Sequence, residues 1–126
     1  MVDFRLKQLD DLISRHNEAR INRWWWKSKP LQKNSFLMNY AQKWSNKMAI
    51  ENKLYHSSMR GIIELGFNTV AENIAYGQKS PEEVMKTWMK SSGHRKNILN
   101  TNFTEIGCGM SLSENGRLYW CVCFAR

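Results

Sequence analysis

The C-terminal quarter of the chain constrains the possible folds more than any other segment. Residues 104–113 and 118–125 have the composition of β-strands, and they flank Asn115-Gly116, the dipeptide preferred in two-residue hairpin turns. Apolar side chains occur at successive positions, so both faces of this hairpin are apolar. A sheet that is apolar on both faces needs a covering layer on each side, which predicts a three-layer arrangement.

A two-residue turn also fixes which residues of the two strands lie opposite each other. It would place Gly107 opposite Phe124 and Gly109 opposite Val122. Because a glycine has no side chain, each glycine would make room for the large residue across from it.

The three cysteines of the chain all fall in this hairpin. The same register places Cys108 directly opposite Cys123, with Cys121 two residues along on the same face. Three thiols on one buried face are typical of reduced core residues. A cross-strand disulfide and a three-thiolate zinc site remain as alternatives. The odd number of cysteines argues against a disulfide framework.

Helical periodicity accounts for most of the remaining chain. Apolar residues recur at helical spacing over residues 4–21 and 35–54. A third helix is expected to begin at residues 80–83, Ser-Pro-Glu-Glu, which combine an N-cap, a first-position proline and a capping box. With a further strand at 69–76, these elements predict an α+β fold: a three-layer α/β/α sandwich with a small antiparallel sheet.

Length and charge limit the functional classes. The 126 residues suit a single domain, 1–126, and no apolar run approaches the roughly 20 residues that would span a bilayer. The N-terminus lacks the pattern of a secretory signal, which leaves a cytoplasmic location and a processed, secreted form as alternatives. The net charge of +8 favours acidic partners in general. No nucleic-acid-binding motif accompanies this charge, so a nucleic acid is disfavoured.

A basic, tryptophan-rich segment offers one candidate interaction surface. Three consecutive residues cannot all face the core from one helix face, so at least one indole is expected to be exposed beside basic side chains. Such a surface would suit a protein, a cell-envelope component or a lipid. The segment comprises Arg23, Trp24, Trp25, Trp26, Lys27 and Lys29.

A second candidate site combines His56, Glu72 and His94. Each lies beside small or turn-forming residues and not in an apolar stripe, which is typical of side chains gathered in a cleft. Imidazole and carboxylate groups suit zinc and also general acid/base chemistry. The histidines could instead cap helices or bind backbone carbonyls, and Glu72 could simply orient an imidazole ring.

Several motifs in a fixed order resemble the CAP superfamily, which comprises cysteine-rich secretory proteins, antigen 5 and pathogenesis-related protein 1. The resemblance spans about residues 12–126 and is nearest to the bacterial single-domain branch, with residues 1–11 as an extension of the N-terminal helix. The motifs are Tyr55-His56-Ser57, Glu72-Asn73-Ile74-Ala75 and Gly93-His94-Arg95, followed by the closing hairpin.

The resemblance implies a cleft with two histidines and two acidic residues that can hold a divalent metal. His56, Glu72 and His94 match three of these places, and Ser91 stands where the second glutamate is expected. Asn73 and Tyr76 would lie at the rim with Ser91.

Most members of the superfamily have no established catalytic activity, and they are typically secreted. The resemblance therefore implies a binding module with zinc as the expected ion. The alternative is a metal-dependent hydrolase of peptide or cell-wall material with Glu72 as the base.

Overall fold

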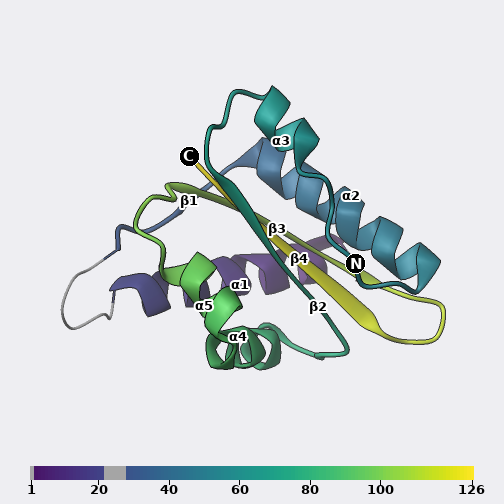
Figure 1. The fold of residues 1–126 in the computed structure, drawn as a ribbon. Coiled ribbons are helices and arrows are strands. Elements are labelled where there is room, and N and C mark those ends of the chain that lie inside the picture. Colours follow the sequence, from purple (N-terminus) through teal and green to yellow (C-terminus); the bar gives the residue numbers. More distant parts are fainter. Residues whose placement is uncertain (1, 22–27) are drawn as a thin grey trace.

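The computed structural model describes residues 2–21 and 28–126 (Figure 1). The elements, in chain order, are α1 (Val2–Ile21), β1 (Gln32–Lys33), α2 (Ser35–Glu51), α3 (Arg60–Glu64), β2 (Val70–Tyr76), α4 (Pro81–Lys90), α5 (Ser92–Leu99), β3 (Glu105–Leu112) and β4 (Leu118–Ala125). The strands form one sheet in the order β1-β3-β4-β2, in which β1 is parallel to β3 and the other pairs are antiparallel.

Helices cover both faces of this sheet, so the predicted three-layer α/β/α sandwich is confirmed. In Figure 1, α2 lies on one side of the sheet, and α1, α4 and α5 lie on the other. Each side has its own apolar cluster, one containing Leu37 and Met48 of α2 and the other Leu12 of α1 and Trp88 of α4. No helix in the described ranges has both the length and the apolar character needed to cross a membrane.

The register of the C-terminal hairpin differs from the prediction by one residue. The strands pair as far as Leu112 opposite Leu118, which leaves residues 113–117 in the turn. Ser113 closes this longer turn, because its N–H donates to the carbonyl of Arg117 at 2.8 Å and its hydroxyl accepts from the N–H of Arg117 at 3.1 Å. The Asn-Gly dipeptide therefore lies within a larger loop and does not form a two-residue turn.

This shift changes the positions of the cysteines. Cys108 lies opposite Val122 and packs on the α1 side, where its thiol donates to the carbonyl of Leu9 at 3.5 Å. Cys121 and Cys123 point to the α2 side. The predictions of three thiols on one face and of Cys108 opposite Cys123 are therefore wrong. A disulfide between Cys108 and Cys123 is excluded because the two side chains lie on opposite faces of the sheet.

The two glycines of β3 face the backbone of α2. Gly107 lies opposite Cys123 and Gly109 opposite Cys121, so the glycines do not make room for Phe124 and Val122 as predicted. A Cβ atom at Gly107 would lie 2.1 Å from the carbonyl carbon of Leu37. The glycines thus allow α2 to pack directly on the sheet.

The helix α4 begins at the predicted N-cap and first-position proline, but the predicted capping box does not form. Ser80 is the N-cap, and its hydroxyl accepts from the N–H of Glu83 at 3.1 Å. The Glu83 carboxylate accepts from the N–H of Lys79, one residue earlier than a capping box requires. Trp88 of α4 then donates its indole N–H to the carbonyl of Ile74 on the edge strand β2, at 3.2 Å.

Arg20 is buried at the end of α1 and binds four backbone carbonyls. Its guanidinium donates to the carbonyls of Lys29 (2.8 Å), Ile98 (2.9 Å), Asn100 (2.8 Å) and Phe103 (3.1 Å). These carbonyls belong to the segment before β1, the end of α5 and the loop that leads to β3. One side chain therefore joins the end of α1 to two stretches of chain that are distant in the sequence, residue 29 and residues 98–103.

His16, one turn before Arg20, is completely buried between Trp88 and Phe124. Its Nδ1 donates to the carbonyl of Leu12 at 2.8 Å. Burial, with a smaller contribution from the charge of Arg20, lowers the pKa of His16 to about 4. The folded protein therefore holds His16 in the neutral form.

We expect Gly109→Ala to lower the free energy of unfolding by about 3 kcal/mol, because the new methyl group would overlap the backbone of α2. Its Cβ would lie 2.5 Å from the Cα of Gln42. The matched control is Gly93→Ala in α5, where a Cβ meets no atom within 4 Å. Urea denaturation of both variants is the measurement, and equal stabilities would contradict the close contact.

We also expect stability to fall between pH 6.5 and about pH 4. The unfolded chain protonates His16 near its ordinary pKa of 6.5, whereas the folded protein does so only near 4. The contribution of neutral His16 is therefore complete above pH 6.5 and is lost as the pH falls, by about 2 to 3 kcal/mol between pH 7 and pH 4.5. Urea denaturation at these two pH values measures this loss of unfolding free energy.

The control for this experiment is His16→Phe, which keeps an aromatic ring between Trp88 and Phe124 but does not titrate. The carboxylates of the protein contribute equally to both profiles, so the difference between them isolates His16. The same pH dependence in both proteins would contradict the assignment.

Candidate functional site

The Glu72 carboxylate lies at the centre of the predicted site and is completely buried. Glu72 lies on β2, and the segment between α2 and α3 supplies its hydrogen-bond donors. Oε1 accepts from His56 Nδ1 at 2.8 Å and from the N–H of Ser57 at 2.9 Å. Oε2 accepts from the hydroxyl of Ser57 at 2.5 Å. These bonds fix the carboxylate, and the Glu72 side chain is 0% exposed whereas that of His56 is 58% exposed.

Tyr40 of α2 extends this hydrogen-bond chain. Its hydroxyl donates to Ser57 Oγ at 2.9 Å, and Ser57 in turn donates to Glu72. Burial is the main reason that the pKa of Tyr40 is raised above its ordinary value. The tyrosine therefore remains a proton donor, and the order Tyr40–Ser57–Glu72–His56 links α2 to an exposed imidazole.

His94 lies on α5 and is held in a similar way by Ser91. Its Nδ1 and Ser91 Oγ are 2.8 Å apart, and the ring lies 6.4 Å from that of Trp88. Partial burial lowers the pKa of His94, and the positive charge that His56 can carry lowers it further. The residue that replaces the expected second glutamate thus still contacts the histidine.

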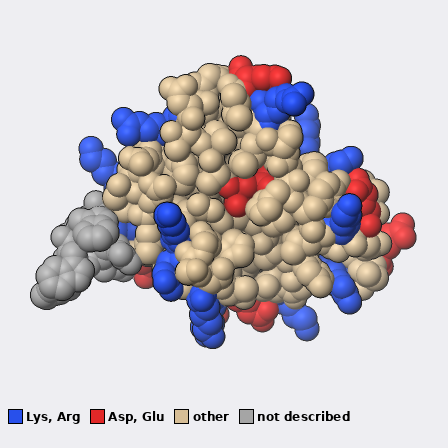
Figure 2. All heavy atoms as spheres, viewed as in Figure 1, with Lys and Arg blue, Asp and Glu red and all other residues tan. Residues whose placement is uncertain are grey.

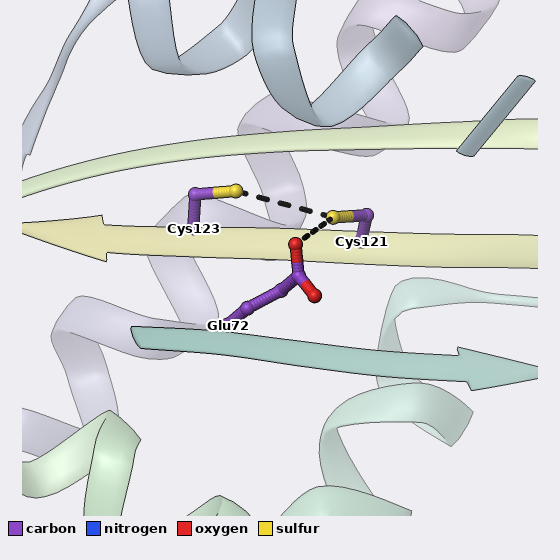
Figure 3. Close-up of side chains that lie close together, drawn as sticks. All are labelled: Glu72, Cys121 and Cys123. Atoms are coloured by element: carbon purple, nitrogen blue, oxygen red, sulfur yellow. Dashed lines mark hydrogen bonds between the residues drawn. The ribbon is translucent and has the colours of Figure 1, made fainter. Parts of the chain in front are cut away.

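The structure brings the predicted ligands together as two pairs. His56 contacts Glu72 and His94 contacts Ser91, but the ligand atoms of His56, Glu72 and His94 do not all lie within 4.8 Å of one another. Within the described ranges, the group that meets this distance is Glu72, Cys121 and Cys123 (Figure 3). The sequence did not indicate this group, because the contact of Glu72 with Cys121 depends on the pairing of β2 with β4.

The predicted rim residues have different roles. Asn73 is buried, donates to the carbonyl of His94 at 3.1 Å and accepts from Asn97 Nδ2 at 2.9 Å, so it joins β2 to α5. Tyr76 is exposed at the end of β2, where its ring stacks on that of Tyr119 at 5.6 Å.

The tryptophan-rich segment lies almost entirely outside the described residues. Arg23, Trp24, Trp25, Trp26 and Lys27 belong to the range 22–27, so their role as a partner surface stays a prediction. Lys29 is described and is exposed.

The face of the molecule that carries β2 has a characteristic charge distribution (Figure 2). Its centre is largely uncharged apart from a small acidic group, and both basic and acidic side chains stand around its edges, with the basic ones more widely spread. A ligand that approached β2 on this face would therefore meet charges of both signs around its edges.

Known proteins resemble this chain in sequence and in fold. An uncharacterized protein of Bacillus subtilis strain 168, YkwD, is 47% identical over 89 residues, which cover 64% of this chain and 35% of the relative. A second B. subtilis relative, the uncharacterized membrane protein YlbC, is 30% identical over 82% of this chain and 31% of its own length. The chain therefore spans about a third of the length of the curated relatives it matches.

Solved structures share the fold. An outer surface protein of Borrelia burgdorferi superposes with a TM-score of 0.79 at 21% identity, over 93% of this chain and 90% of that one. NaASP2, whose structure is described as containing Zn²⁺, has a TM-score of 0.66 at 14% identity, over 95% of this chain and 77% of that one. The family model named CAP, cysteine-rich secretory protein family, matches residues 13–124. The chain belongs to the CAP family.

Proposed function

We propose that this protein is a CAP-type binding module in which His56 and His94 hold a divalent cation, with zinc as the expected ion. The observation that carries the proposal is that both imidazoles are held through Nδ1, by Glu72 and by Ser91 respectively. Because Nδ1 of each ring is hydrogen-bonded, Nε2 remains as the ligand atom, and the hydrogen bond fixes the orientation of the ring. The lowered pKa of His94 favours the neutral, metal-binding form of its ring.

In this proposal Glu72 orients His56 and does not itself bind the ion. Its Oε1, the oxygen that faces His56, already accepts hydrogen bonds from His56 Nδ1 and from the N–H of Ser57, and the side chain is completely buried. A carboxylate behind a histidine ligand is a common arrangement at zinc sites. Zinc would take Nε2 of both histidines, with water or a ligand in the remaining positions. The presence of Zn²⁺ in the similarly folded NaASP2 supports the choice of ion.

The same geometry gives less support to a metal-dependent hydrolase. Its general base would have to reach the attacking water, whereas Glu72 is buried and its Oε1 is held by His56 and by the N–H of Ser57. A hydrolase would show metal-dependent turnover of peptide or cell-wall material that Glu72→Gln abolishes.

The partner that best suits the protein is an anionic cell-envelope component. The net charge is +8, and basic side chains, with some acidic ones among them, lie at the edges of the face that carries β2 (Figure 2). One relative is described as a membrane protein, and another structure with this fold is an outer surface protein. A cation at the two histidines would add positive charge to the same face.

Zinc titration by calorimetry tests the proposal. We expect the reduced wild-type protein to bind Zn²⁺ saturably, and His56→Ala/His94→Ala to bind one equivalent less. The double variant should keep its fold because His56 is exposed and His94 is half-buried. Equal stoichiometry and affinity in the two proteins would refute the proposal.

Ser91→Ala provides a second, more local test. It removes the oxygen that holds His94 Nδ1, so we expect the affinity for zinc to fall by roughly ten-fold. Ser92→Ala is the matched control because Ser92 is the exposed neighbour, and it should leave the affinity unchanged. Equal affinities of the two variants would show that Ser91 does not position His94.

A further inference from the structure

Two thiols and a carboxylate converge on the α2 side of the sheet. Cys121 and Cys123 are two residues apart on β4, so their side chains point to the same face, and their sulfur atoms are 4.0 Å apart. The Cys121 thiol lies 3.8 Å from Glu72 Oε2, on the neighbouring strand β2 (Figure 3). The three residues are buried.

We propose that Cys121, Cys123 and Glu72 form a second site, separate from the two histidines, that binds a thiophilic divalent cation such as Zn²⁺. Zinc–sulfur bonds are about 2.3 Å long, so an ion bonded to two sulfurs 4.0 Å apart would see them at about 120°. This angle is close to that of zinc thiolate sites. Glu72 Oε2 is the third ligand atom within reach.

The charge balance of the buried site favours a divalent ion. Burial is the main cause of the strongly raised pKa of the Cys121 thiol. When one Zn²⁺ binds, two S–H bonds break, two Zn–S bonds form and two protons leave to solvent. The net charge of the interior is then unchanged. A monovalent copper ion would leave one additional buried negative charge, which is costly.

Cys108 provides an internal comparison for this proposal. It is buried like the other two cysteines, but it lies on the opposite face of the sheet and its thiol donates to the carbonyl of Leu9. It therefore cannot join the site without a change of register. The proposed site consequently has two thiolates and not three.

The site is independent of the histidine pair although both involve Glu72. Oε1 of the carboxylate contacts His56, whereas Oε2 is the oxygen near Cys121. Removal of the two imidazoles leaves both sulfurs and Oε2 in place. The outcome of the histidine experiment and the outcome for the cysteine site can therefore be told apart.

Access to the buried thiols requires movement of the segment between α2 and α3. Ser57 in this segment donates both its N–H and its hydroxyl to Glu72, so it covers the carboxylate. We therefore expect metal uptake to be slow in the folded protein and fast when the protein refolds in the presence of the ion.

Titration of the reduced, metal-free protein with Co²⁺ tests the proposal, because cobalt–thiolate bonds give an intense near-ultraviolet charge-transfer band. We expect the wild type, refolded with Co²⁺, to develop this band at one equivalent, and added Zn²⁺ to displace it. His56→Ala/His94→Ala should keep the band. Absence of the band in the wild type would overturn the proposal whether or not any variant folds.

The variants identify the ligands. Cys121→Ser/Cys123→Ser should lose the band, whereas the matched control Cys108→Ser should keep it. Glu72→Gln should keep the band but weaken binding by about ten-fold or more. A band that persists in the double cysteine variant, or that disappears in Cys108→Ser, would refute the assignment.

Discussion

The arrangement of the polypeptide on the α1 side depends on the buried guanidinium of Arg20. A buried charge is costly unless its donors are satisfied, and here four carbonyl groups, from residue 29 and from residues 98–103, accept from the guanidinium. Two of these carbonyls, of Ile98 and Asn100, lie at the C-terminal end of α5. Arg20 thereby fixes the helix that carries His94, so one half of the candidate cation site depends on a side chain far from it.

The other half depends on how closely α2 approaches the sheet. Gly107 and Gly109 allow the helix backbone to contact β3, and this distance brings the Tyr40 hydroxyl within reach of Ser57. Ser57 and Tyr40 then hold Glu72, which in turn orients His56. The two histidines are therefore positioned by different means. The buried guanidinium of Arg20 acts on the α1 side of the sheet, and the close packing of the α2 backbone acts on the other side.

The sequence predicts the helices, the hairpin and the layered fold because these features follow from local patterns. The register could not be read correctly, because Asn115-Gly116 is also compatible with the longer turn that Ser113 closes. A shift of one residue moves every side chain of a strand to the other face, which is why the grouping of the thiols was wrong. The contact between Glu72 and Cys121 depends on the pairing of β2 with β4, which no local pattern specifies.

The indole of Trp88 has a consequence for the sheet edge. β2 is an edge strand, and such strands can recruit strands of other molecules through their unpaired backbone groups. The hydrogen bond from Trp88 to the Ile74 carbonyl occupies one of these groups in the middle of β2. The carbonyl that the indole occupies is therefore not available to pair with a strand of another molecule.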